Sequence, residues 1–245
     1  MPHVKRKLPE MADFHIHSFH SDGGLGPAEV FRRAQVAGIG AVGISDHADF
    51  SNAVRVIQEN LQAAMRERRL TEGIVAFTGI ELTHVRPRHI AHLVETARHA
   101  GAEYVIVHGE TIAEPVAPGT NRAAIKAGCD ILAHPGLISK KDAELAAKKG
   151  VLLEISSKTG HSLANGHVAN MARATSAKLI YGSDTHEPEH LHNKQKALKV
   201  LLAAGMTEKE AARAIHNAIQ MYKRLYDAFV RKDEDNGEKE EGPGL

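Results

Sequence analysis

Short apolar runs alternate with amphipathic segments along most of the 245 residues, and this alternation restricts the fold more than any other feature. Val and Ile are prominent in several of these runs, as expected for strands buried on both faces. The predicted strands span 12–16, 40–45, 74–80, 103–107, 130–134, 151–155 and 178–182. The predicted helices span 27–37, 52–70, 88–100, 120–127, 140–149, 166–175 and 191–204. Such an alternation implies parallel strands joined by right-handed crossovers, and seven repeats favour a closed barrel over an open sheet.

A final helix is predicted over 208–230. Thr207 and Glu210 have the spacing of a capping box, and apolar residues then recur every three or four positions. Residues 231–245 are charged and almost free of apolar side chains, which predicts a disordered acidic tail. With residues 1–11 as an N-terminal extension, we expect one α/β domain over 12–230.

Composition narrows the classes of partner. The 31 basic and 30 acidic residues leave a net charge of +1, so we expect no broad electrostatic field that would attract nucleic acid or a membrane. No apolar run reaches the roughly 18 residues of a membrane span. The single cysteine, Cys129, excludes an intrachain disulfide and fits a reducing cytoplasm. We therefore expect a cytoplasmic protein that acts on a small molecule.

Histidine is the outlier in the composition, with 17 residues. Neutral imidazole is the commonest metal ligand in proteins. In a parallel barrel the carboxyl ends of all strands lie on one face, where the active sites of such folds are built. Ligand-type residues stand at six of these strand ends, with one more in the first loop: His15, His17, Asp22, His47, Glu81, His108, His134, Asp184 and His186. Nine are too many for one ion, and they suit two or three ions with a shared carboxylate.

The same residues carry a family resemblance. The segments DFHIHSFHSDGG, ISDHAD, GIEL, VHGE, AHPG and GSDTH resemble, in order and spacing, the PHP (polymerase and histidinol phosphatase) superfamily. The similarity runs from about Ala12 to the final helix. It implies a distorted (β/α)7 barrel, similar to a TIM barrel, with a trinuclear metal site and phosphoesterase activity.

The resemblance also implies how the metal ions are shared. His15, His17, Glu81 and Asp184 would hold the first ion, and Glu81 would bridge to a second ion that His108 and His134 complete. The third ion would be held by Asp22, His47 and His186. Some relatives have a histidine at the position of Asp22, and the aspartate keeps a ligand there.

Other residues are assigned supporting roles. Asp13 and Asp46 precede ligand histidines, and we expect both carboxylates to orient imidazoles from outside the ligand set. Phosphate binding needs positive charge or oriented amides. Arg122, Lys158 and His161 lie in loops expected on the active face, and are candidates for phosphate contact or, for Lys158 and His161, leaving-group protonation.

We therefore expect a phosphomonoesterase that uses a metal-activated hydroxide and no side-chain nucleophile. Histidinol phosphate is the leading substrate, by resemblance only. A nuclease or nucleotide phosphatase of the same superfamily is the alternative, although the absence of Trp disfavours tracking of a nucleic-acid strand. A non-catalytic metal-binding barrel is the third interpretation. Zinc, manganese and iron all suit the ligands, and the sequence leaves the oligomeric state open.

Overall fold

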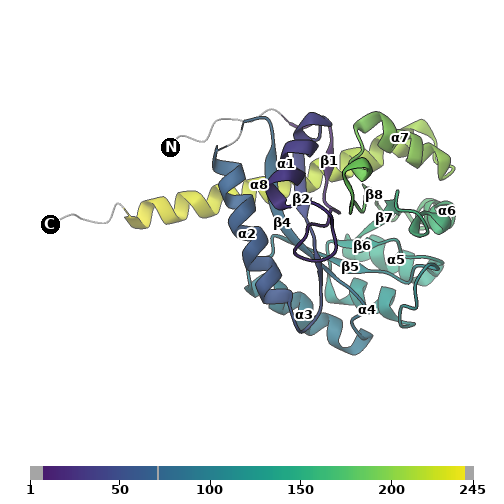
Figure 1. The fold of residues 1–245 in the computed structure, drawn as a ribbon. Coiled ribbons are helices and arrows are strands. Elements are labelled where there is room, and N and C mark those ends of the chain that lie inside the picture. Colours follow the sequence, from purple (N-terminus) through teal and green to yellow (C-terminus); the bar gives the residue numbers. More distant parts are fainter. Residues whose placement is uncertain (1–7, 71, 241–245) are drawn as a thin grey trace.

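The structure, a computed structural model, describes residues 8–70 and 72–240. A parallel sheet lies at its centre and helices surround it (Figure 1). The strands run in the order β1-β2-β4-β5-β6-β7-β8, and the short β3 also pairs with β4. Their bounds are β1 (Ala12–Asp13), β2 (Ala41–Ile44), β3 (His47–Ala48), β4 (Val75–Leu82), β5 (Tyr104–His108), β6 (Ile131–Ala133), β7 (Leu152–Ser156) and β8 (Leu179–Gly182).

The two edges of the sheet meet just beyond β1 and β8. Ile16 forms an isolated parallel bridge with Thr185, and the backbone N–H of His17 donates to the carbonyl of Thr185 at 2.8 Å. The sheet is therefore nearly closed into a barrel, which confirms the predicted α/β, TIM-like fold. One difference is β3, an eighth strand in the described residues where seven were expected. It arises because the chain leaves the sheet at Ser45–Asp46 and then pairs again.

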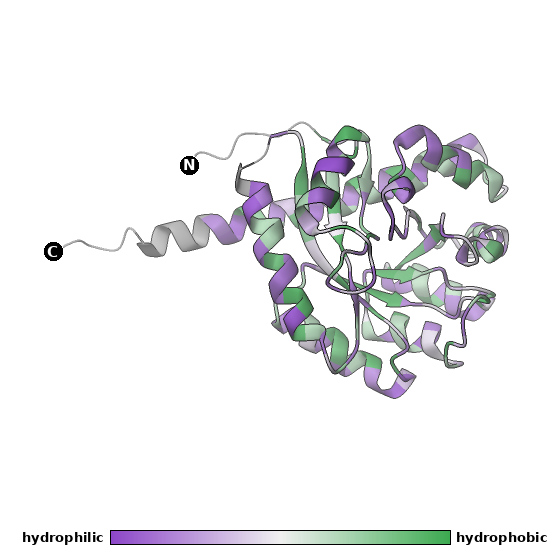
Figure 2. Ribbon diagram, viewed as in Figure 1, coloured by the Kyte–Doolittle hydropathy of each residue, from purple (hydrophilic) through white to green (hydrophobic). Residues whose placement is uncertain are grey.

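Seven helices cover the outside of the barrel. Pro27 and Pro87 occupy the first positions of α1 and α3, where the fixed φ of proline suits a helix start. The side chains of Ser139 and Asn193 cap α5 and α7. Hydrophobic and hydrophilic residues alternate around the helices, as amphipathic helices on a sheet require (Figure 2). The bounds are α1 (Pro27–Val36), α2 (Ala53–Leu70), α3 (Pro87–His99), α4 (Thr120–Ala127), α5 (Lys140–Lys149), α6 (Asn165–Thr175) and α7 (Lys194–Ala203).

The eighth helix, α8 (Glu208–Glu240), closes the amino end of the barrel. Its buried residues from Ala218 to Leu225 pack in one cluster with strand residues of the barrel interior. There the Tyr222 ring lies edge-on to Phe77, with centroids 6.0 Å apart. Tyr104 of the same cluster fills the barrel interior, and its hydroxyl donates to the carbonyl of Phe14 at 2.9 Å. Figure 1 shows α8 passing behind the sheet and extending beyond it.

The ends of the chain differ from expectation. α8 continues to Glu240, so residues 231–240 are helical where the sequence predicted a disordered tail. Nucleation is the costly step of helix formation, so a helix already started by packing extends further at low cost, and six of these ten residues are Lys, Arg or Glu, which favour helix. Residues 241–245 lie outside the described part. Met11, at the end of the predicted N-terminal extension, is fully buried, and its carbonyl accepts from the N–H of Gly40.

Within the described ranges, no helix combines the length and the apolar composition that crossing a membrane requires.

The packing of α8 leads to a stability prediction. Tyr222→Ala should lower the free energy of unfolding by about 3–5 kcal/mol, because it opens a cavity beneath the barrel. Lys223→Ala, on the exposed side of the same helix, serves as the matched control and should change little. Chemical denaturation of both variants measures the difference, and equal midpoints would show that α8 does not stabilise the barrel.

Candidate metal centre

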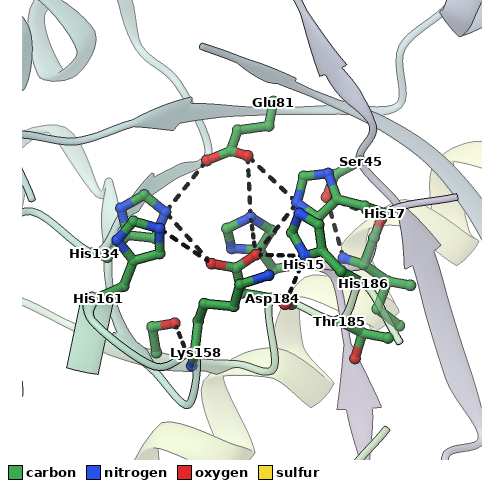
Figure 3. A network of polar contacts seen from close by, with 12 residues as sticks. His15, His17, Ser45, Glu81, His134, Lys158, His161, Asp184, Thr185 and His186 are labelled. Atoms are coloured by element: carbon green, nitrogen blue, oxygen red, sulfur yellow. Dashed lines mark hydrogen bonds and ion pairs between the residues drawn. The ribbon is translucent and has the colours of Figure 1, made fainter. Parts of the chain in front are cut away.

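Five imidazoles surround one fully buried carboxylate at the carboxyl face of the barrel. Glu81, near the end of β4, has no exposed surface. Ring nitrogens lie close to its two oxygens in every case: His15 at 3.3 Å, His17 at 3.4 Å, His47 at 2.9 Å, His108 at 3.2 Å and His134 at 3.5 Å. Figure 3 shows this carboxylate facing the histidine side chains. These residues come from strand ends that the topology brings together.

Two further carboxylates complete the group. Asp184 follows β8, and its oxygens lie 3.3 Å from His186, 3.5 Å from His17 and 3.7 Å from His134. Asp22 lies in the first loop, 3.3 Å from His186 and 3.7 Å from His47. The nine side chains predicted as ligands therefore converge in one cluster. Their role as ligands stays a prediction.

The donor atoms fit divalent cations. Several buried atoms of the cluster have no hydrogen-bond partner among the described residues: His15 Nε2, both nitrogens of His17, Glu81 Oε2, His108 Nε2 and His134 Nδ1. Such atoms are costly to bury unless a ligand satisfies them. Three inner groups each have donor atoms within 4.8 Å of one another: His17, Asp22, His47 and His186; His15, His17 and Asp184; and His15, Glu81 and His134. Nitrogen and carboxylate donors at this spacing suit zinc, manganese or iron.

The electrostatics also favour a cation. Burial disfavours the charged form of Glu81, but the neighbouring His15 and His47 outweigh it and hold the pKa of Glu81 well below its ordinary value. Burial likewise opposes the charge on His108, yet Glu114 and Glu81 raise its pKa to about 9. Protons here occupy positions that metal ions would take, so metal binding would release them and would strengthen as pH rises.

Glu154 on β7 supports two of the histidines and was not predicted. It is fully buried, and its Oε1 lies 2.8 Å from Nδ1 of His15. Its other oxygen accepts from the backbone N–H of His134 at 3.0 Å. Glycine at position 182 makes this possible, because a Cβ there would overlap Oε1 of Glu154. The sequence did contain a signal for this role: Glu154 is the one charged residue in the apolar run 151–155, and a buried strand keeps a charged residue only where it has partners.

Asp13 and Asp46 act on the backbone and loops, which corrects their predicted role of orienting imidazoles. Oδ1 of Asp13 accepts from the backbone N–H groups of His15 and Ser183. Asp46 accepts from Ser18, Ser21 and Asn60: two side-chain hydroxyls, one backbone N–H and one amide. It therefore fixes the first loop, which carries Asp22. Both carboxylates are short and lie at the strand ends, so the nearest donors are main-chain and loop groups.

The cluster opens into a cavity of about 140 Å³. Lys158 and His161 both line it, as expected, and Lys158 lies beside Asp184 and His161 in Figure 3. Arg122 does not line it: its guanidinium is half exposed and pairs with Asp142 at 2.6 Å. The prediction for Arg122 is wrong because its position in the first turn of α4 directs the side chain toward α5.

Two more residues join the site that the sequence did not indicate. Glu114, in the loop between β5 and α4, lines the cavity and lies 3.1 Å from His108 and 3.1 Å from His84. His84 follows β4 and had no predicted role. Both lie beyond the strand ends, where the path of a loop decides which way a side chain points. No local pattern marked them.

Comparison of the sequence with known proteins finds a domain profile and a relative. Residues 13–110 match the sequence profile of the PHP domain. An uncharacterized protein of Methanocaldococcus jannaschii is 43% identical over 215 residues, which cover 87% of this chain and 99% of that protein.

Two solved structures share the fold at low identity. One is histidinol phosphate phosphatase of Lactococcus lactis, solved with zinc, L-histidinol and phosphate; it is 17% identical, with a TM-score of 0.55 over 81% of this chain and 95% of that one. The other is a chain in the structure of an archaeal ribonuclease P with mature tRNA, 15% identical, with a TM-score of 0.65 over 89% of this chain and 93% of that one. At these identities, the likeness shows the fold.

Asp13 leads to a pH-dependent stability prediction for metal-free protein. Burial raises its pKa from 3.8 to about 6. A carboxyl group whose pKa is raised on folding stabilises the fold below its unfolded pKa, and this contribution disappears as pH rises through its folded pKa. Asp13→Asn cannot ionise, so it should match the unsubstituted chain below pH ~4 and exceed it by roughly 3 kcal/mol above pH ~6. Denaturation across this range measures the difference, and a difference independent of pH would contradict the prediction.

Proposed function

We propose that this chain, which belongs to the PHP domain family, hydrolyses a small phosphate monoester in the cavity above Glu81. The observation that carries the proposal is the convergence of nine histidine, aspartate and glutamate side chains on a cavity that also contains a lysine. Such a cavity combines sites for cations with positive charge for an anion. Phosphate esters are a substrate class that uses both.

The residues of the cluster would hold two or three divalent ions. Glu81 would be shared between ions, because its two oxygens face different histidines: Oε2 faces His15, His17 and His47, whereas Oε1 faces His108 and His134. Bound ions would supply an acidified water and neutralise charge on the phosphoryl oxygens. The chain's own part is to fix their positions. For His15, Glu154 does so by holding Nδ1 and leaving Nε2 toward Glu81.

Lys158 and His161 are the side chains that we assign to phosphate contact or leaving-group protonation. Both line the cavity from the segment after β7. The His161 ring stacks on His134 with centroids 4.0 Å apart, and its Nδ1 lies 2.8 Å from the hydroxyl of Thr111. Its Nε2 is thereby directed at the cavity, 4.0 Å from Asp184. Lys158 contributes a cation that is independent of metal loading.

The size of the cavity supports a small reacting group. About 140 Å³ accommodates a phosphate group and a few more atoms, well below the roughly 300–1,000 Å³ of pockets that enclose a drug-sized ligand. The Lactococcus lactis relative was solved with L-histidinol and phosphate, and for this reason histidinol phosphate is the first monoester that we propose as substrate.

A nuclease or nucleotide phosphatase is the second candidate. The likeness to a chain of archaeal ribonuclease P favours it, although that likeness is one of fold. The net charge of +1 and the absence of Trp disfavour tracking along a nucleic-acid strand. A non-catalytic metal-binding barrel would be expected to lack ligands, whereas all nine positions carry one.

A substrate screen separates these candidates. Purified protein is incubated with manganese, zinc or iron and with histidinol phosphate, other monoesters, dinucleotides or short oligonucleotides. We expect metal-dependent release of phosphate from a monoester. Cleavage of oligonucleotides alone would support the nuclease, and no turnover with any metal would leave the non-catalytic barrel.

Glu81→Gln tests the shared carboxylate. The amide keeps the shape of the side chain but lacks the charge that neutralises two cations, so turnover should fall below detection. Circular dichroism should show an intact fold. Glu95→Gln, an exposed change on α3, is the control and should retain activity. Turnover by metal-loaded Glu81→Gln at the level of the unsubstituted chain would rule out the shared role.

Lys158→Ala and Arg122→Ala each remove one positively charged side chain, and they form a matched pair. A charge-assisted hydrogen bond contributes roughly 1.5–3 kcal/mol, so Lys158→Ala should lower kcat/KM by about 10- to 150-fold. Arg122→Ala should stay within about twofold, because Arg122 pairs with Asp142 outside the cavity. Steady-state kinetics with one monoester gives both values. If Lys158→Ala also stays within twofold, Lys158 does not contact the phosphate.

A further inference from the structure

Three large apolar side chains are exposed on the loops of the carboxyl face. Ile112 lies in the loop between β5 and α4, and Leu137 lies in the loop between β6 and α5. Leu163 lies in the short 3₁₀ helix η1 (His161–Ala164) that follows β7. The three residues are 54%, 67% and 72% exposed, in that order. Single exposed apolar residues are ordinary, whereas several at one place mark a binding surface. We call this set the apolar rim.

The loops that carry the apolar rim are in direct contact with one another. The loops after β5 and β6 meet at Gly136, where a Cβ would overlap the carbonyl oxygen of Glu110. The loops after β5 and β7 meet where the hydroxyl of Thr111 lies 2.8 Å from Nδ1 of His161. Each residue of the apolar rim is only one or two positions from one of these contacts. The apolar rim therefore belongs to one continuous part of the surface.

The apolar rim adjoins the cavity. Glu114 and His161 both line the cavity, and each lies two positions from a rim residue. Lys158 lines it from the same segment as His161. Because Lys158 and His161 are our two candidates for protonating the leaving group, the ester oxygen of a bound substrate would face their side of the cavity. The leaving group would then emerge beside the apolar rim.

The cavity is too small to enclose a monoester with a bulky leaving group. Its volume of about 140 Å³ accommodates the phosphate group and a few more atoms. In the proposed reaction, water supplies the oxygen that bonds to phosphorus, and the bond between phosphorus and the ester oxygen breaks. The ester oxygen takes up a proton and leaves as an alcohol. Most of a bulky alcohol must therefore lie outside the cavity, against the surface that forms its mouth.

We propose that the apolar rim binds the leaving alcohol, and that the substrates are phosphate monoesters of apolar alcohols. The inference rests on the proposed function and names its class of substrate. Contact with the rim removes apolar surface of both partners from water, which favours an alkyl or aryl group at this position. Polar leaving alcohols, including histidinol, gain less from the same contact.

A series of primary alkyl phosphates tests the proposal. Protein loaded with manganese, zinc or iron is assayed with ethyl, butyl and hexyl phosphate, and with 2-(2-hydroxyethoxy)ethyl phosphate as the polar isostere of the hexyl ester. These alcohols have similar acidity, so differences in rate report contact with the protein. We expect kcat/KM to rise roughly two- to fourfold for each added methylene. Hexyl phosphate should exceed its polar isostere by at least about tenfold.

Substitutions in the apolar rim show whether these residues cause the gain per methylene. Leu137→Ser and Leu163→Ser should each lower this gain, and a triple variant that also carries Ile112→Ser should reduce it to less than about 1.5-fold. The change should appear in KM and not in kcat, because an apolar contact outside the cavity is equally strong in the ground and transition states. Leu202→Ser, which changes an exposed leucine on α7, is the matched control and should keep the full gain.

Two results would overturn this inference and leave the proposed function standing: turnover independent of chain length in the unsubstituted chain, or an undiminished gain in the triple variant. Self-association that the triple variant abolishes, without any dependence on chain length, would assign the apolar rim to an interface between copies of the chain. Absence of turnover with every ester would contradict the proposed function, and this inference with it. Melting curves show which variants are folded, and the single variants decide if the triple variant is not.

Discussion

One buried carboxylate determines the arrangement of the whole active face. Glu81 has no exposed surface, and a charge in such a position is tolerated only if cations or strong donors surround it. Five histidines from the strand ends supply that environment, and each reaches Glu81 because the parallel strands all end on one side. Closure of the sheet at Ile16 and Thr185 brings the first and last of these segments together.

A second layer of interactions fixes the histidines. Glu154 links His15 and the backbone of His134, and the absence of a side chain at Gly182 leaves space for it. Asp46 ties the first loop to Asn60 at the buried side of α2. These contacts involve only groups of the chain itself. They reduce the conformational entropy that metal binding would otherwise have to overcome.

Features that repeat along the chain, or that parallel strands impose, could be predicted from the sequence. The strand–helix alternation located every strand except β3. The rule that strand ends share one face placed eight of the predicted ligands together, and the first loop adds Asp22; their role as ligands stays a prediction. The strand-end rule did not locate Glu114 and His84, because the direction of a side chain in a loop depends on tertiary contacts. Arg122 was misplaced for a related reason: a residue in the first turn of a helix can face the barrel mouth or the next helix. The helical continuation of α8 beyond Val230 was missed because low hydrophobicity was taken to indicate disorder, whereas a helix that packing has already started can continue through charged residues.

The position of α8 also limits how molecules reach the site. Because Tyr222 and its neighbours close the amino end of the barrel, the cavity is a blind recess and not a channel. Whatever enters must leave through the same opening, so a product has to depart before the next molecule can occupy the recess. A long polymer cannot thread through the barrel. It could only offer a terminus, presented end-on, with the remainder of the chain lying outside on the loops.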